Sequence, residues 1–380
     1  MPPISFNEVP ANILVPFVYV EFDNSQAIQG PQIQPYKGLL IGQKTADGTQ
    51  ADLTPVRITS AQEAANLFGP GSMLHGMAQA WFASNRFTEV WAVSVAETGM
   101  AASAGALDVG GTATESGTLN IYIAGRRVQV AVASGDTAVD IAEALEAAIN
   151  ADTSLPVLAE VDGEDDSIVN LTAKNKGLPG NFIDSRMNYA EEETPAGVTV
   201  AITQLTGGTG APDLDDLWAA LGDEHFNIWA HPYTDTASMT AIKAELKTRS
   251  GPTIQHDAVA FAVIEGSVST VGTFGDGHNN EFIVVAARQN TPTSPLEMAA
   301  EIAAVVALNG QRDPAPVPNA ESSLDQGPGE SGPLHAGRTQ PDPCGRHCNH
   351  ESHAGRLCYA GTDRDNLQTK QHGRGRLFLS

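Results

Sequence analysis

DLDDLWAAL (213–221) opens a stretch in which helical and extended patterns alternate up to Gly310. It continues with FNIWAHPY (226–233), SMTAIKAELKTR (238–249), AVAFAVIE (258–265), a short helix near 267–272, EFIVVAAR (281–288) and SPLEMAAEIAAVVALNG (294–310). The extended runs are apolar at nearly every position, which is typical of strands buried on both faces, and amphipathic helices separate them. We therefore predict an α/β fold in which residues 213–312 form a core domain with a mostly parallel sheet.

Residues 36–97 carry a second α/β pattern. YKGLLIG (36–42) and EVWAVSV (89–95) are expected to be strands. Between them, Ser60 and Glu63 have the spacing of a capping box that opens the helix AQEAANLF, and the GPG at 69–71 ends it. A further helix is predicted over 72–84. We interpret 36–97 as the N-terminal part of the core.

Residues 98–212 differ in composition and begin with a stretch rich in small residues and turn formers. LNIYIAGRRVQVAVA (119–133) predicts a hairpin turning at Ala124-Gly125, and VLAEVDGEDDSIVNLTA (157–173) predicts another. TAVDIAEALEAAINA (137–151) has one apolar face and predicts a helix between them. GVTVAITQLTGGTGAPDL (197–214) has the pattern of a strand followed by a Gly-rich linker. We predict a small α+β domain inserted into the core and projecting from its surface.

The two ends of the chain differ in composition from its middle. Residues 1–35 are rich in proline and contain the β-prone run ILVPFVYVEF (13–22), which predicts an extended arm. Residues 313–380 hold all three cysteines and five of the ten histidines, with few aliphatic residues and no periodicity, so we expect a disordered tail. Moving the reading frame one base onward from Pro316 permits PFQTLSLPWIKAPA, which suggests that the tail is out of frame.

Several of these stretches resemble Mu-like contractile phage tail sheath proteins. They are SFNEVPANILVPFVYVEFDNSQA (5–27), YKGLLIGQK (36–44), VRITSAQEAANLFGPGSMLHGMAQAWFASN (56–85), EVWAVSV and the run from HFNIWAHPYTD to NGQRDPA (225–315). Such proteins usually continue after DPA with a Pro-Phe-Gln-Thr-Leu stretch, which this chain has only in the shifted frame.

The resemblance implies a structural subunit, not an enzyme, that needs no cofactor or metal. It implies a helical homopolymer that surrounds the tail tube and contracts to drive DNA delivery, with the tail tube, baseplate and tail terminator proteins as further partners. The protein would be assembled in the bacterial host cytoplasm and reside in the virion. Strand addition by terminal arms would join neighbouring subunits, and the matching arm residues here are Ile13, Val15, Phe17, Tyr19 and Phe22.

Charge and hydropathy limit the partners. The formal net charge is −24, and residues 1–312 hold 37 acidic against 14 basic side chains. Because phosphate backbones would be repelled, we expect no direct nucleic-acid binding. No apolar run approaches the roughly 20 residues of a membrane helix, and the N-terminus lacks the basic region of a secretory signal, so no membrane partner is expected.

An enzyme is a second hypothesis, because α/β sheets with parallel strands often carry active sites. Asp257, His278 and Ser267 could form a hydrolase triad, but no Gly-x-Ser-x-Gly turn accompanies any serine. The acidic run at 162–166 could bind Ca²⁺, although it lacks EF-hand spacing and is more typical of a solvated hairpin tip. The histidines His225 and His231 flank FNIWA and are interpreted as structural.

The tail contains a set of residues that could bind zinc: Cys344, His347, Cys348, His350, His353 and Cys358. Their spacing fits no standard zinc motif, so we expect no metal site. Two further hypotheses are a small-molecule-binding α/β protein and a tail-tube or baseplate subunit. Tube proteins are usually smaller and β-dominated, which disfavours them here.

Overall fold

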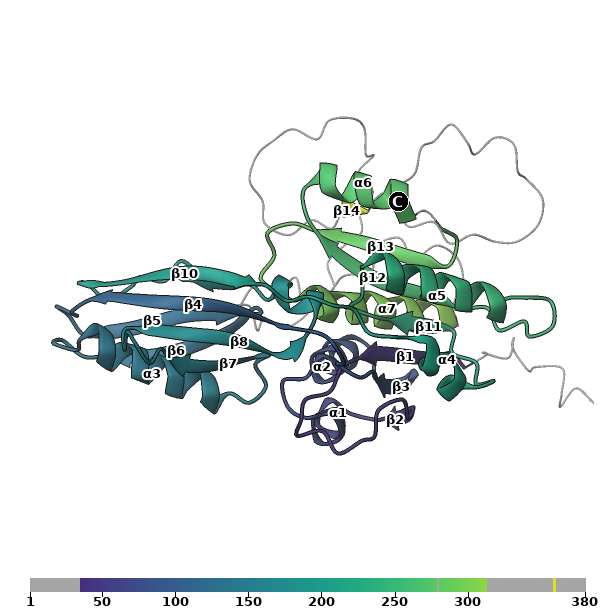
Figure 1. Ribbon diagram of the computed structural model, residues 1–380, viewed down its shortest axis with the longest axis horizontal. Coiled ribbons are helices and arrows are strands. Elements are labelled where there is room, and N and C mark those ends of the chain that lie inside the picture. The colour runs from purple at the N-terminus through teal and green to yellow at the C-terminus, as the bar shows by residue number, and fades with distance from the viewer. Residues whose placement is uncertain (1–34, 279, 313–357, 360–380) are drawn as a thin grey trace, which may run out of the picture. The chain divides into compact units, whose positions relative to one another are not determined.

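The computed structural model describes residues 35–278, 280–312 and 358–359 (Figure 1). These residues form a mixed α/β fold with several sheets, as the sequence predicts. The predicted arm with Ile13, Val15, Phe17, Tyr19 and Phe22 lies outside the described residues. So does the predicted tail, apart from a two-residue strand at Cys358–Tyr359.

A seven-stranded sheet, here called the core sheet, has the order β14-β13-β12-β11-β1-β3-β2. Its inner pairings, β3 with β1, β1 with β11, β11 with β12 and β12 with β13, are parallel, whereas β2 and β14 pair antiparallel at the two edges. The strands are β1 Lys37–Gly42, β2 Val56–Ile58, β3 Glu89–Ser94, β11 Ile228–Ala230, β12 Val259–Glu265, β13 Ile283–Arg288 and β14 Cys358–Tyr359.

Helices cover both faces of the core sheet (Figure 1). Along β1, Leu40 packs in a cluster with side chains of α1, α2 and α7, whereas Leu39 and Ile41 pack with side chains of α4 and α5. This alternation is the period of two that a strand imposes, with both faces buried. The helices are α1 Ala61–Phe68, α2 Met73–Ser84, α4 Asp215–Leu221, α5 Thr236–Arg249, α6 Val268–His278 and α7 Pro295–Arg312.

Residues 98–212, here called the two-sheet segment, have a core of their own. One sheet has the order β10-β4-β8-β7 and the other β6-β5-β9. Helix α3 packs with both sheets around one apolar cluster. The elements are β4 Ala102–Gly111, β5 Gly117–Ile123, β6 Arg126–Val132, α3 Ala138–Ala151, β7 Val157–Val161, β8 Ile168–Lys176, the 3₁₀ turn η1 Leu178–Phe182, β9 Ser185–Met187 and β10 Val198–Thr206.

Local sequence signals predict one turn correctly and one helix cap in part. Ala124 and Gly125 have φ values of 50° and 77°, as a primed two-residue hairpin turn requires. The Ser60 side chain accepts from the Glu63 amide, but the Glu63 carboxylate accepts from Thr59 instead of the Ser60 amide, so the predicted capping box is only half formed. The Thr59 hydroxyl and amide hold the pKa of Glu63 below its usual value.

Some elements differ from the sequence-based expectation. Strands β2, β4 and β9 carry no clear alternation and are not predicted. Helix α6 runs to His278 instead of ending near Gly272. FNIWAHPY contributes only three strand residues, because the chain turns away at Pro232, which has no amide hydrogen for the ladder.

Candidate functional site

The residues considered for catalysis do not form a triad. The Ser267 hydroxyl accepts from the Thr270 amide (3.3 Å) at the start of α6, and a ring nitrogen of His278 lies 3.0 Å from the Phe274 carbonyl oxygen. The Asp257 carbonyl oxygen is 2.9 Å from a ring nitrogen of His225. In the described part of the chain, no hydrogen bond joins any two of Asp257, His278 and Ser267.

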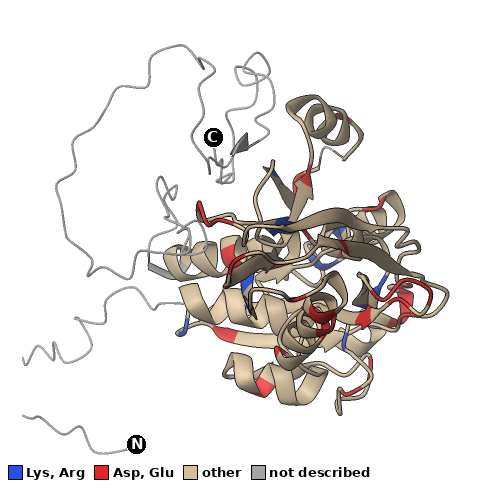
Figure 2. Cartoon of the chain, turned by 90° about the vertical axis from the view of Figure 1, so that its left-hand side faces the viewer, with Lys and Arg blue, Asp and Glu red and all other residues tan. Residues whose placement is uncertain are grey.

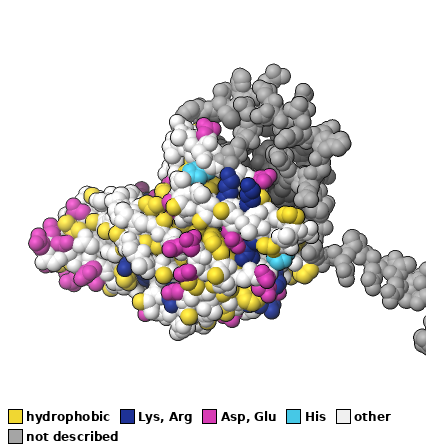
Figure 3. Space-filling model, turned by 45° about the vertical axis from the view of Figure 1, so that its right-hand side comes forward, with side chains coloured by type: hydrophobic (Ala, Val, Ile, Leu, Met, Phe, Trp, Pro, Cys, Tyr) yellow, Lys and Arg dark blue, Asp and Glu magenta, His cyan; other side chains and the backbone are white. Residues whose placement is uncertain are grey.

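The acidic run at 162–166 is the tip of the β7–β8 hairpin. Asp162 accepts from the amides of Glu164 (2.9 Å) and Asp165 (3.2 Å) and from the Asn170 side chain (2.8 Å). These hydrogen bonds lower the pKa of Asp162. Its carboxylate oxygens therefore already have partners within the hairpin. Acidic side chains gather at this far end of the two-sheet segment (Figure 3). In the described part of the chain, Figure 2 shows many more acidic than basic residues along the ribbon.

His231 follows β11 at the carboxyl end of the core sheet and is fully buried. Burial lowers the pKa of His231 to about 4, and the Tyr233 backbone and the Asp235 charge oppose part of that shift. Tyr233 is buried beside this turn, and burial raises the pKa of its hydroxyl. The ring of His231 is therefore a neutral packing element at pH 7.

The point where β1 and β11 meet is where open α/β sheets commonly bind ligands. In this protein, the side chains of Gln43 and Met100 fill the space at the carboxyl end of β1. Gln43, which follows β1, is fully buried and donates to the Met100 sulfur (3.3 Å). Met100 belongs to the connection that leads from β3 into the two-sheet segment, and it is also buried. A substrate could not occupy the same place without displacing Met100.

Asn175, at the end of β8, ties the two-sheet segment to three parts of the core. Its side-chain oxygen accepts from the Met73 amide at the start of α2 (2.8 Å). Its amide group donates to the Lys44 carbonyl oxygen (2.9 Å) and to the Glu97 carboxylate (2.8 Å). The Asn175 side chain thus accepts a hydrogen bond from a free amide in the first turn of α2. It also holds the loops after β1 and β3 in place.

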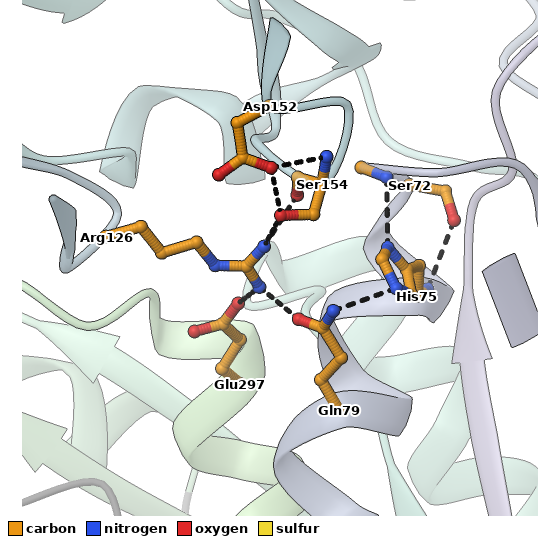
Figure 4. A network of polar contacts seen from close by, with 8 residues as sticks. Ser72, His75, Gln79, Arg126, Asp152, Ser154 and Glu297 are labelled. Carbon is orange, nitrogen blue, oxygen red and sulfur yellow. Dashed lines mark hydrogen bonds and ion pairs between the residues drawn. The ribbon is translucent and has the colours of Figure 1, made fainter. Parts of the chain in front are cut away.

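Arg126, at the start of β6, forms a second tie (Figure 4). Its guanidinium donates to the Ser154 carbonyl oxygen (2.8 Å) and hydroxyl (2.7 Å) within the two-sheet segment. It also donates to Gln79 on α2 and to Glu297 on α7 (3.1 Å). Burial raises the pKa of Glu297, and the Arg126 charge opposes that rise.

His75 lies in the same network. One ring nitrogen accepts from the Gly71 amide (3.0 Å), and the other is 2.9 Å from the Gln79 side chain (Figure 4). Burial, followed by the nearby charges of Arg126 and Lys174, lowers the pKa of His75 to about 4.

A third tie involves Arg288 at the end of β13. Its guanidinium donates to Glu265 (2.6 Å) and to the Phe182 carbonyl oxygen of the two-sheet segment (3.3 Å). We call the three ties formed by Asn175, Arg126 and Arg288 the junction. The cavity at the junction measures about 30 Å³. That is room for about one water and far less than a ligand pocket of several hundred Å³.

The junction residues are not identified by the sequence analysis. The sequence offers two weak signals: Arg126 follows a primed turn, and Glu297 and Glu301 interrupt an otherwise apolar helix. The geometry indicates attachment between two parts of one chain. Among the described residues, no group of three or more His, Cys, Asp or Glu side chains is placed to hold a metal ion.

Similarity to known proteins agrees with a structural role. Residues 97–213 match the phage tail sheath protein beta-sandwich domain, and residues 207–321 match the phage tail sheath protein central domain. The Mu-like prophage FluMu tail sheath protein of Haemophilus influenzae is 37% identical over 314 residues. This alignment covers 82% of the chain, which spans 64% of the relative's length.

Two solved sheath tail proteins are also similar, at a level too low to define the fold. The one from Desulfitobacterium hafniense is 13% identical with a TM-score of 0.32, covering 77% of this chain and 62% of its own. The one from Listeria innocua is 14% identical with a TM-score of 0.30, covering 72% and 56%. The identity to the FluMu protein and the two adjoining domain matches confirm the resemblance in the sequence: the chain belongs to the phage tail sheath protein family.

Proposed function

We propose that this protein is the subunit of a contractile tail sheath, which polymerises around the tail tube and contracts to drive DNA delivery. The observation that carries the proposal is the 37% identity to the FluMu tail sheath protein over most of the chain. The subunit would have a non-enzymatic role, with itself, the tail tube, the baseplate and the tail terminator as partners. It would be assembled in the host cytoplasm and become part of the virion.

Residues 98–212 would be a domain inserted into a core built on parallel strands. In support, the two connections of the two-sheet segment run side by side: the Ala101 amide donates to the Thr209 carbonyl oxygen (3.0 Å), and the Thr209 amide donates back (3.3 Å). A segment whose ends are paired can be added to a loop without disturbing the strands on either side. The junction would then transmit force from this domain to the core.

Subunits would be joined by strand addition. The proposed donor is the arm with Ile13, Val15, Phe17, Tyr19 and Phe22, which would extend a neighbouring subunit's sheet. Main-chain hydrogen bonds along such a strand can hold neighbours together while their globular parts change position.

No direct contact with DNA or a membrane is proposed. The acidic charge of residues 1–312 would repel a phosphate backbone. In the described part of the chain, no helix is long and apolar enough to cross a membrane.

Assembly of the purified protein tests the proposal. The chain with its reading frame restored from Pro316 should form tubes or rings in negative stain and sediment as large species. Deleting residues 1–20 should leave a folded monomer, because only main-chain pairing to a neighbour is lost. A frame-restored chain that stays monomeric at all concentrations would contradict the sheath assignment, whereas tubes from the truncated chain would contradict only the arm.

A further inference from the structure

The most exposed large apolar side chain in the described part of the protein is Phe87, at 82%. It lies in the short loop between α2 and β3. Single exposed apolar residues are common on protein surfaces and need no explanation by themselves. The loop that carries Phe87, however, is held in one conformation by a buried side chain.

That side chain is Asn85, which is 1% exposed. Its oxygen accepts from the amides of Phe87 (3.0 Å) and Thr88 (3.1 Å). Its nitrogen donates to the Thr88 hydroxyl (2.8 Å) and to the Ala304 carbonyl oxygen on α7 (2.9 Å). All four hydrogen-bonding positions of the amide are used, so the loop is fixed to the core and the Phe87 ring is presented to solvent in a fixed place.

The place of Phe87 in the core sheet helps to identify the segment that could dock on it. Strand β3 pairs with β1 in parallel, with Glu89 opposite Lys37. Phe87 lies two residues before β3, and Pro35 lies two residues before β1. Phe87 and Pro35 therefore precede neighbouring parallel strands and lie at the same end of the core sheet.

The positive charge of Arg86, next to Phe87, complements the acidic residues of the N-terminal segment. Arg86 is exposed, and its Nε atom donates to the Phe82 carbonyl oxygen (3.0 Å). Its terminal guanidinium nitrogens make no ion pair or hydrogen bond with any described residue. Residues 1–34 contain Glu8, Glu21 and Asp23 and no Lys or Arg. A segment that is apolar over residues 13–20 and acidic just after complements a ring beside a cation.

We propose that Phe87, with Arg86, is the anchor on which the N-terminal segment of a second copy docks, through apolar residues within 13–22. The proposal rests on the self-assembly set out under the proposed function and adds the receiving residue. Aromatic residues, Phe among them, and arginine are both enriched in protein interfaces. Because the loop is already ordered, docking costs little conformational entropy on the side of Phe87.

Isotope-coded cross-linking tests the partner directly. Unlabelled frame-restored chain with Phe87→benzoylphenylalanine is mixed with an equal amount of ¹⁵N-labelled frame-restored chain and irradiated. The linked peptides are identified by mass spectrometry. We expect links from position 87 to ¹⁵N-labelled residues 10–25. Links only within one copy, links to other surfaces, or no links would overturn the proposal. Benzoylphenylalanine at Val268, which is 78% exposed on α6, is the matched control.

Self-association measured by sedimentation separates this proposal from the one it rests on. Phe87→Ser should weaken association about tenfold or more without lowering the melting temperature, whereas Val268→Ser should change neither. Equal association of both variants would overturn the anchor while leaving the polymer in place. A frame-restored chain with Phe87 and Val268 intact that never associates would overturn both.

Discussion

The ring of Tyr36 lies against Gly310: its Cε2 atom is 3.1 Å from the position that a β-carbon on Gly310 would occupy. Tyr36 immediately precedes β1, and Gly310 is in the last turn of α7. The chain therefore enters the core and leaves its last described helix at neighbouring points.

Gly38 in β1 also lies close to a large side chain, so we expect its substitution to destabilise the protein. A β-carbon on Gly38 would lie 2.4 Å from Cη2 of Trp81, a fully buried side chain that cannot move aside. We expect Gly38→Ala to lower the free energy of unfolding by about 1–3 kcal/mol, through overpacking. Chemical denaturation measures this.

The matched control is Gly272 on α6, where a β-carbon would meet open space. Gly272→Ala should raise the free energy of unfolding by up to about 1 kcal/mol, because alanine favours helix. Equal effects at the two glycines would show that Trp81 adjusts.

The buried His231 predicts a pH dependence of stability. Its pKa is about 4 in the folded protein and near 6.5 when unfolded. Between these values the unfolded state binds more protons, so stability falls as the pH falls from about 6.5 to 4. The loss is about 1.4 kcal/mol per pH unit, or about 3 kcal/mol in total.

The variant His231→Leu should remove this part of the slope. The measured quantity is the difference between the two proteins' free energies of unfolding, followed from pH 7 to pH 4.5. His75 remains in both and contributes equally to each, so it cancels. Parallel curves for the two proteins would contradict the assignment of a neutral, buried His231.

We expect the loss of the Asn175 side-chain amide to lower the free energy of unfolding strongly. Asn175→Ala leaves the Met73 amide and the Lys44 carbonyl oxygen without their partner in a buried place, which should cost about 2–4 kcal/mol. Hydrogen exchange at Met73 should rise, and the connections at 95–101 and 207–213 should become sensitive to protease.

Asn150→Ala is the control, because Asn150 bonds only with Ala159 inside the two-sheet segment. It should lower stability without exposing the connections to protease. Identical cleavage patterns in the two variants would mean that Asn175 does not hold the segment to the core.

The Arg126 and Glu297 pair predicts strong non-additivity. Arg126→Met removes the cation beside a buried carboxylate and should cost about 3–5 kcal/mol. Adding Glu297→Met should recover a large part of that loss, because no charge is then left buried. Arg127→Met, at the exposed neighbouring position, should change stability little. Additive losses in the double variant would show that the pair is not coupled.

The sequence by itself determined the alternation of elements in this protein. Apolar runs such as AVAFAVIE can be satisfied only by burial on both faces, and Ala124-Gly125 adopts the positive φ values of its turn for local steric reasons. Local chemistry also set the starts of α1 and α2, where serines cap the first turn.

Only the tertiary structure decided which distant residues meet. Strand β4 shows no period of two in the sequence and is ordered by pairing with β8 and β10 on either side. Asn175 and Met73 are 102 positions apart, and Arg126 and Glu297 are 171 apart. A polar residue looks the same in the sequence whether it faces water or a buried partner. The difference arises when the surrounding elements pack and remove the water, which is why the junction could be found only in three dimensions.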